Sequence, residues 1–194
     1  MKGKLIVLYG INNLGKTTQA KLLVEKLQHI GHQAEYLKYP IYDLSPSGTI
    51  LNEYLRYGNP YNLSAREAQI IYAFNRAQFE PTLKNKLTQG IHIISEDYTG
   101  TGLAWGIGAG VEEKFLKHIN AHLLPEDAAF LFDGSRFTDA TEQNHKHETD
   151  DVLIEKVRTA HLRLGAEFNW QKINANLSIE EINRQILTYV EKML

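Results

Sequence analysis

The chain lacks cysteine, a strong excess of either charge, and any long apolar run. Without cysteine it can form neither a disulfide framework nor a thiolate metal site, and it has no cysteine nucleophile. No stretch approaches the roughly 18 apolar residues that a membrane span requires. The formal net charge of −2 disfavours a nonspecific nucleic-acid-binding protein, which would present a basic face. No signal-like segment precedes the first apolar run, so we expect a cytoplasmic protein without membrane or nucleic-acid partners.

The composition is that of one globular domain. The 194 residues fall within the usual size of a single domain, and 43% are hydrophobic against 23% charged. Short strand-like runs alternate with segments of helical periodicity, which favours an α/β fold with a parallel sheet of about five strands and helices on both faces. We expect a single domain over 1–194. The strand-like runs are Leu5–Tyr9, Ala34–Tyr39, Ile91–Ser95, Ala128–Phe132 and Gln171–Asn174.

Residues 10–17, GINNLGKT, fit the phosphate-binding pattern G-x-x-x-x-G-K-[ST]. A strand-like run precedes them and leucines at helical spacing follow, so a helix should open near Lys16. In this arrangement the backbone N–H groups of the loop and the helix N-terminus bind a phosphate chain. The Lys16 ammonium would reach the β- and γ-phosphates, and the Thr17 hydroxyl would contact Mg²⁺. The segment therefore predicts an ATP site formed by Gly10, Ile11, Asn12, Asn13, Leu14, Gly15, Lys16, Thr17 and Thr18.

Two acidic residues, Glu96 and Asp97, follow the strand-like run 91–95. Ligands of parallel sheets gather at the carboxyl ends of the strands. A carboxylate there can order Mg²⁺ through water or accept a proton from an attacking oxygen. Because side chains alternate along a strand, we expect only one of the two acids to face the phosphate loop. The alternative is that both cap the next turn.

A long helix is predicted over Ser64–Glu80, with Ser64 and Glu67 forming a capping box. Tyr72 and Arg76 lie four residues apart on this helix and share a face. An aromatic ring with a guanidinium one turn later can stack on a base and hydrogen-bond its edge. Aromatic residues at this spacing are also common on helix faces that pack into a core, so both interpretations stay open.

Residues 134–151 are almost all polar and directly follow the run 128–132 and Asp133. A polar segment of this length inside a compact domain is usually functional or mobile. Beside a phosphate loop it predicts a lid over the triphosphate. The alternative is a solvated surface connection.

Along nearly its whole length the chain resembles the thymidylate kinases, a branch of the P-loop nucleoside monophosphate kinases. The phosphate loop alone indicates only a protein that binds a nucleoside triphosphate, and an ordered series of weaker motifs makes the resemblance specific. The motifs are Gly15-Lys16-Thr17-Thr18-Gln19, Lys38-Tyr39-Pro40, Gly48 to Leu55, Tyr72-Ala73-Phe74-Asn75-Arg76, Glu96-Asp97-Tyr98, Thr101-Gly102-Leu103-Ala104, Lys146-His147-Glu148, Trp170 to Ala175 and Ser178 to Glu181.

The resemblance implies a three-layer P-loop NTPase fold and Mg²⁺-dependent transfer of the γ-phosphoryl group from ATP to dTMP, carried out by a homodimer. Tyr72 would stack on the thymine ring, and Arg76 would hydrogen-bond a base carbonyl. Lys38 would lie near the acceptor phosphate, and Tyr98 and Trp105 would line the deoxyribose side. The residues implied to bind the acceptor are Lys38, Pro40, Tyr72, Arg76, Asp97, Tyr98, Gly102 and Trp105.

The resemblance also assigns catalytic and metal-binding roles. Lys16 and Glu96 would act at the phosphates, with Thr17 and Glu96 beside Mg²⁺. Relatives whose phosphate loop has no arginine tend to carry catalytic arginines in the lid. The corresponding segment of this chain offers Arg136 and Lys146.

Two positions depart from the family pattern. The family places an arginine where this chain has Tyr42 and another where it has Asp97, and both normally bind the monophosphate of the acceptor through their bidentate forks. Other cations would have to compensate. Two alternatives therefore remain: a P-loop kinase for another deoxynucleotide or a deoxynucleoside, and a non-catalytic nucleotide-binding protein. The candidate cations are Lys38, Arg56, Arg136, His145, Lys146 and His147.

Overall fold

The structure, a computed structural model, describes residues 2–136 and 150–194. Most of the expected lid over 134–151, including Lys146 and its neighbours His145 and His147, therefore lies outside the described residues. In chain order the elements are β1 (Leu5–Tyr9), α1 (Lys16–His29), β2 (Ala34–Lys38), α2 (Ser47–Arg56), α3 (Ala65–Thr88), β3 (His92–Glu96), α4 (Thr99–Gly108), α5 (Glu113–Asn120), β4 (Ala128–Asp133), α6 (Asp151–Glu167), β5 (Gln171–Asn174) and α7 (Ile179–Glu191).

The five strands form one parallel sheet in the order β2-β3-β1-β4-β5, which confirms the predicted α/β class. The central strand β1 is buried throughout, as its unbroken apolar sequence predicts. Val7 of β1 lies opposite Ser95 of β3 and Ala129 of β4. The chain leaves β1 toward β2 on one side and leaves β3 toward β4 on the other. The crevice between such diverging connections, at the carboxyl ends of β1 and β3, is where open α/β sheets bind ligands.

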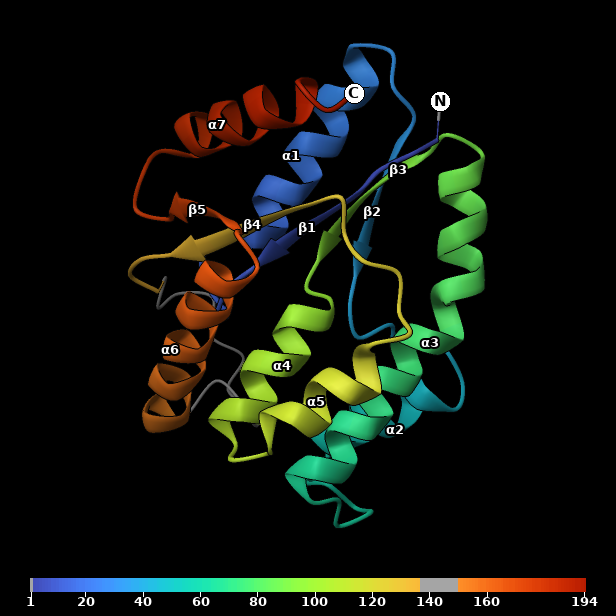
Figure 1. The fold of residues 1–194 in the computed structure, drawn as a ribbon, viewed down its shortest axis with the longest axis vertical. Helices are drawn as coiled ribbons and strands as arrows, with labels where there is room; N and C mark the ends of the chain where they lie inside the picture. The colour runs from blue at the N-terminus through green and yellow to red at the C-terminus, as the bar shows by residue number, and fades with distance from the viewer. Residues whose placement is uncertain (1, 137–149) are drawn as a thin grey trace.

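Helices cover both faces of the sheet and complete three layers. Helices α1 and α7 lie on one side, and α3, α4 and α6 lie on the other (Figure 1). Alternate residues of β1 serve the two sides: Ile6 belongs to the apolar cluster that includes residues of α1 and α7, whereas Val7 packs in the cluster that includes Leu83 and Leu87 of α3. Within the described ranges no helix combines the length and apolarity needed to cross a membrane.

Helix α3 is longer than the sequence pattern predicts. The capping box is present, because the Ser64 hydroxyl accepts from the Glu67 backbone N–H at 3.2 Å and the Glu67 carboxylate accepts from the Ser64 backbone N–H at 2.8 Å. The helix passes through Pro81 and ends at Thr88 instead of Glu80. Proline removes one backbone donor, and burial of Leu83 and Leu87 against β1 favours continuation.

Candidate nucleotide-binding site

The phosphate loop connects β1 to α1 through backbone conformations that favour glycine. Gly10 has a φ of +135° and Gly15 a φ of +81°. A Cβ on Gly10 would lie 2.6 Å from the Phe132 carbonyl oxygen, so a side chain there would force the loop away from β4. Helix α1 begins at Lys16, and no side chain caps its N-terminus. Its first N–H groups and the positive end of its dipole are therefore available to an anion.

Lys16 is held at the mouth of this loop. Its side chain is buried, and Nζ donates to the Gly10 and Ile11 carbonyl oxygens at 2.9 and 2.8 Å. Asp97 Oδ1 lies 3.9 Å from the same nitrogen. An ammonium carries three N–H donors. Two of these N–H groups donate to loop carbonyls, and these hydrogen bonds fix the position of the ammonium beside the cavity. The third N–H group can donate to an anion.

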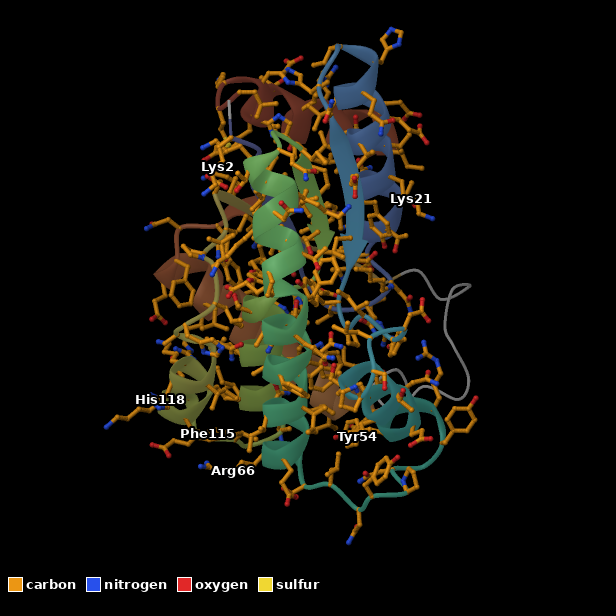
Figure 2. All side chains as sticks on the ribbon, turned by 90° about the vertical axis from the view of Figure 1, so that its right-hand side faces the viewer. Lys2, Lys21, Tyr54, Arg66, Phe115 and His118 are labelled. Carbon is orange, nitrogen blue, oxygen red and sulfur yellow. The ribbon has the colours of Figure 1, made fainter. Side chains whose placement is uncertain are left out.

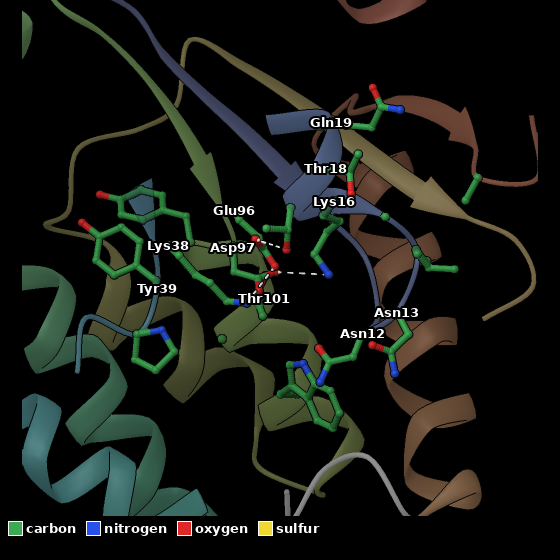
Figure 3. A pocket seen from close by; sticks show the side chains of 18 of the residues that line it. Asn12, Asn13, Lys16, Thr18, Gln19, Lys38, Tyr39, Glu96, Asp97 and Thr101 are labelled. Carbon is green, nitrogen blue, oxygen red and sulfur yellow. Dashed lines mark hydrogen bonds and ion pairs between the residues drawn. The ribbon is translucent and has the colours of Figure 1, made fainter. Parts of the chain in front are cut away.

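The Glu96 carboxylate joins three elements at the end of β3. Oε2 accepts from the Thr17 hydroxyl at 2.7 Å, and Oε1 lies 3.1 Å from Lys38 Nζ (Figure 3). Oε2 also accepts from the Tyr36 hydroxyl at 2.6 Å. Burial alone would raise the pKa of Glu96, but Lys16, Lys38 and the two hydroxyl donors outweigh it, so the pKa is lowered. Glu96 is therefore ionised near neutral pH.

Asp97 also faces the phosphate loop, so the expectation that only one acid would do so was wrong. It follows the last residue of β3 and adopts a φ of +64°, which takes it out of the strand alternation. Oδ1 accepts from the Thr101 hydroxyl at 2.8 Å and points toward Lys16. Burial raises the pKa of Asp97, and the proximity of Glu96 adds to this, while Lys16 opposes it.

A cavity of about 720 Å³ extends from the phosphate loop to α3. Figure 3 looks into it, with Lys16 and Asn12 on the loop side and Lys38 and Tyr39 across the opening. The structure thus brings together most of the residues that the sequence singles out. Those that line this cavity are Asn12, Asn13, Leu14, Gly15, Lys16, Thr17, Thr18, Lys38, Pro40, Tyr72, Arg76, Glu96, Asp97, Tyr98, Gly102 and Trp105.

Arg76 forms part of the cavity wall in a fixed orientation. Its Nε and Nη2 donate to Asn120 Oδ1 at 3.2 and 2.9 Å, and Nη1 donates to the Tyr98 carbonyl oxygen at 3.4 Å. A Cβ on Gly102 would lie 2.7 Å from Nη2, so glycine lets the guanidinium pack against α4. Tyr72, one turn earlier on α3, is half-buried beside the same cavity.

Three predicted residues do not line this cavity: Gly10, which lines neither cavity, and Ile11 and Arg136. Ile11 and Arg136 line a second cavity of about 880 Å³ at the carboxyl ends of β4 and β5. There Arg136 Nη1 is 3.6 Å from Asp151 Oδ1. The structure therefore does not bring Arg136 into the cavity that holds Lys16 and Glu96. The catalytic role expected for Arg136 stays a prediction, as does that of Lys146.

Some residues of the first cavity were missed by the sequence argument. Gln69 is buried and its Oε1 has no hydrogen-bond partner among the described residues. It precedes Tyr72 and Arg76 by three and seven positions, so helical spacing alone could have placed it on their face. Arg56, which the sequence analysis names as a candidate cation, and Tyr42, one of its two departures from the family pattern, also line the cavity, from α2 and the loop before it. No local motif predicts their proximity.

A glycine-rich loop between the central strand and α1, with a buried lysine and a strand-end acid facing it, defines a P-loop NTPase fold. The family model for thymidylate kinase matches residues 8–186, and the chain belongs to the thymidylate kinase family, a family of nucleoside monophosphate kinases. The chain is 29% identical to the thymidylate kinase of Homo sapiens over 194 residues, covering 95% of this chain and 88% of that protein.

Two further relatives agree with this assignment. The thymidylate kinase of Plasmodium falciparum is 26% identical over 199 residues, with coverage of 99% of this chain and 91% of that protein. The solved structure of thymidylate kinase from Candida albicans superimposes with a TM-score of 0.80 at 21% identity, covering 98% of this chain and 92% of that one. At this identity the structural match supports the fold, while the family assignment rests on the sequence match.

Proposed function

We propose that this protein transfers the γ-phosphoryl group of ATP to dTMP, producing ADP and dTDP in the cytoplasm, where both substrates would be available. Membership of the thymidylate kinase family supports this activity. The observation that carries it is the shared cavity, which has Lys16 and Thr17 at one end and Tyr72 and Arg76 at the other. Donor and acceptor would thus meet in one enclosed space, as a direct transfer requires.

At the donor end, the loop N–H groups and the N-terminus of α1 would bind the phosphates, and Lys16 would neutralise charge on the transferred group. The Thr17 hydroxyl and the Glu96 carboxylate are 2.7 Å apart, and hard oxygen ligands of this kind suit Mg²⁺. These two residues would hold the ion with the phosphates of ATP. Mg²⁺ bound there would offset negative charge on the β- and γ-phosphates.

At the acceptor end, the Tyr72 ring would stack on the thymine base, and the remaining N–H groups of Arg76 would hydrogen-bond its edge. Lys38 would lie beside the acceptor phosphate. Tyr98 and Trp105 would pack against the deoxyribose. Because phosphoryl transfer needs little covalent chemistry from the protein, holding the two substrates in line is its main contribution.

The test is ADP release from Mg-ATP with each acceptor in turn: dTMP, dUMP, dCMP, dGMP, dAMP, thymidine and deoxycytidine. We expect strong preference for dTMP. Turnover with a nucleoside or another monophosphate, and none with dTMP, would instead assign the protein a different acceptor. Binding of ATP without turnover of any acceptor would mean a non-catalytic role.

We further propose that the protein is a homodimer that pairs through α3. Figure 2 looks onto this long helix, which lies at the centre of the view, with Arg66 and Phe115 near its lower end. Ile70 and Phe74 are 45% and 43% exposed, and Pro81 is exposed further along. Their spacing places them on one face of the helix. An apolar stripe of this kind is suited to self-association about a two-fold axis.

Replacing Phe74 with glutamate places a charge in the middle of this stripe. We expect the F74E variant to elute as a monomer of 22.1 kDa in size-exclusion chromatography with light scattering, whereas the wild type has twice that mass. Ile30→Glu is the matched control, because Ile30 is 48% exposed at the end of α1, away from α3. Equal masses for F74E and the wild type would exclude this face as the interface.

A further inference from the structure

The cavity is acidic where an acceptor phosphate would have to lie. Glu96 and Asp97 both line it, and no arginine stands at either of the two positions where the family pattern has one. This inference rests on the proposed function, in which the acceptor is a nucleoside monophosphate. The phosphate of such an acceptor carries about two negative charges near neutral pH. Such a dianion needs cations of its own, because like charges in a site of low dielectric repel each other strongly.

Four basic side chains of the described residues line this cavity: Lys16, Lys38, Arg56 and Arg76. Lys16 belongs to the phosphate loop, where its ammonium donates to two loop carbonyls. Arg76 directs three of its N–H groups to Asn120 and Tyr98. The other two basic residues of this lining are Lys38, which pairs with Glu96 at 3.1 Å, and Arg56 on α2, whereas Arg136 lines the second cavity.

Arg56 stands at the end of α2 with its guanidinium stacked on the Tyr42 ring, 4.6 Å from the centroid. One of its nitrogens, Nη1, also donates to Asn52 Oδ1 at 3.1 Å, one turn back on the helix. Stacking occupies the flat face of a guanidinium and directs its N–H groups outward in the plane of the group, the geometry in which a guanidinium pairs with two oxygens of one phosphate. The ring and the asparagine together fix the direction of those edges.

Tyr42 connects this arginine to the rest of the acceptor end. Its ring belongs to the small apolar cluster that also contains Tyr72, the residue proposed to stack on the base. Lys38 lines the same cavity: burial lowers the pKa of Lys38, but Glu96 outweighs this and raises it, and the nearby Tyr42 hydroxyl adds to the rise. Lys38, Tyr42 and Arg56 thus line the same cavity, with Arg56 stacked on Tyr42 and Lys38 near enough to Tyr42 for its pKa to respond.

We propose that Arg56, held flat on the Tyr42 ring, binds the 5′-phosphate of the acceptor nucleotide, with Lys38 as the second cation. Tyr42 acts as a positioning residue: it holds the guanidinium and need not contact the phosphate itself. In this arrangement the stacked arginine on α2 binds the acceptor phosphate in place of the arginines that the family pattern has at positions 42 and 97.

The test compares binding of a monophosphate with binding of the matching nucleoside. We measure Kd by calorimetry for dTMP and for thymidine, and KM for dTMP and for ATP, in the wild type and in R56Q, R56K and R184Q. Arg184 is an exposed arginine on α7 outside the cavity and serves as the control. Loss of a charge-assisted pair should raise the Kd and KM for dTMP about 10- to 100-fold in R56Q. The Kd for thymidine and the KM for ATP should stay within about twofold.

The R56K variant distinguishes the contribution of the planar guanidinium from that of its positive charge. R56K restores a point charge without the planar fork, so its KM for dTMP should lie between those of the wild type and R56Q. Y42F keeps the ring and should behave like the wild type, whereas Y42L removes the stack and should raise the KM for dTMP toward that of R56Q. If a variant failed to fold, its thermal midpoint and its affinity for ATP would fall as well, so thermal unfolding and ATP binding together identify this case.

Each result decides the question. If R56Q binds dTMP as tightly as the wild type does, Arg56 is not the phosphate ligand, even where dTMP kinase activity is confirmed. If R56Q weakens dTMP and thymidine equally, Arg56 acts on the nucleoside portion and the proposal is wrong. If another monophosphate is the better acceptor, the same comparison with that nucleotide and its nucleoside tests Arg56 independently of dTMP. Turnover of thymidine without dTMP would overturn both proposals.

Discussion

Replacing Lys16 with methionine should lower kcat for phosphoryl transfer by at least about 10²- to 10³-fold, the usual loss when one preorganised group that stabilises transition-state charge is removed. Methionine keeps an unbranched apolar stem of similar length but has no ammonium. In the structure that ammonium is fixed by the Gly10 and Ile11 carbonyls beside the cavity. The charge therefore needs no reorganisation when the phosphoryl group moves, and no other lysine is held by the loop carbonyls in the part of the chain described.

The same substitution has a smaller cost in stability. Two loop carbonyls lose their donor, and leaving such groups unpaired lowers the free energy of unfolding by about 1–3 kcal/mol. Asp97, whose pKa burial already raises, loses Lys16 as its counter-charge and can take up a proton instead of remaining as an unpaired ion. We therefore expect K16M to fold, with a lower thermal midpoint and very slow turnover.

Steady-state ADP release and thermal unfolding measure the two effects separately. Lys26→Met is the control, because Lys26 is exposed on the same helix and lies outside the cavity. K26M should retain the kcat of the wild type. Near-normal kcat in K16M would remove Lys16 from the catalytic site and with it the proposed mechanism. Loss of far-ultraviolet circular dichroism would mean that the kinetics report unfolding, and K16A would then replace K16M.

The features that sequence predicts well are those encoded locally. The phosphate loop needs glycine at two positions with positive φ and a helix directly after it, so its pattern is contained in residues 10–17. The shared cavity position of Tyr72 and Arg76 follows from helical spacing on α3. The contact between Thr17 and Glu96 joins residues 79 positions apart. The sequence still predicts that Glu96 lies near the phosphate loop, because the carboxyl ends of the strands of a parallel sheet meet at one edge.

The features that sequence missed depend on tertiary geometry. The turn of Asp97 toward Lys16 comes from a positive φ just after β3, which no periodicity encodes. The extension of α3 beyond Pro81 depends on burial of Leu87 against the sheet, which overrides the local effect of proline. The stack of Arg56 on Tyr42 joins a helix end to a separate loop. In each instance packing between elements, and not local propensity, selects the conformation.

Glu96→Gln is the second change with a large expected effect. We expect kcat to fall about 10²- to 10³-fold, as for loss of an electrostatic group at the reacting phosphates. The Mg²⁺ concentration needed for half-maximal activity should rise as well. The amide has nearly the same shape but no charge, and it offers one acceptor oxygen in place of two. The Thr17 and Tyr36 hydroxyls, which donate to one carboxylate oxygen, and Lys38, beside the other, can then no longer all be satisfied.

A Mg²⁺ titration of initial rates at saturating ATP and dTMP measures this effect. Tyr36→Phe is the matched control: it deletes one hydroxyl donor to Glu96 but leaves the carboxylate charge, so kcat should fall only a few-fold. If E96Q and Y36F lose activity equally, the carboxylate is needed only to order the hydroxyl network. An unchanged Mg²⁺ requirement in E96Q would remove Glu96 from the metal site.

The pH dependence of stability gives an independent check on the charge of Glu96. Its pKa in the folded protein is lowered from the ordinary value of 4.5 by Lys16 and Lys38, despite opposing burial. A depressed carboxylate pKa contributes stability that is present above the unfolded pKa and lost as pH falls through the folded pKa. The difference in unfolding free energy between wild type and E96Q should therefore be constant from about pH 8 to pH 6 and shrink only in acid, below about pH 4.5. If the wild type instead gained stability relative to E96Q as the pH fell from 8 to 6, the pKa of Glu96 in the folded protein would be raised and not lowered. A carboxyl that is partly protonated near neutral pH would be a poor ligand for Mg²⁺ and a poor partner for Lys38.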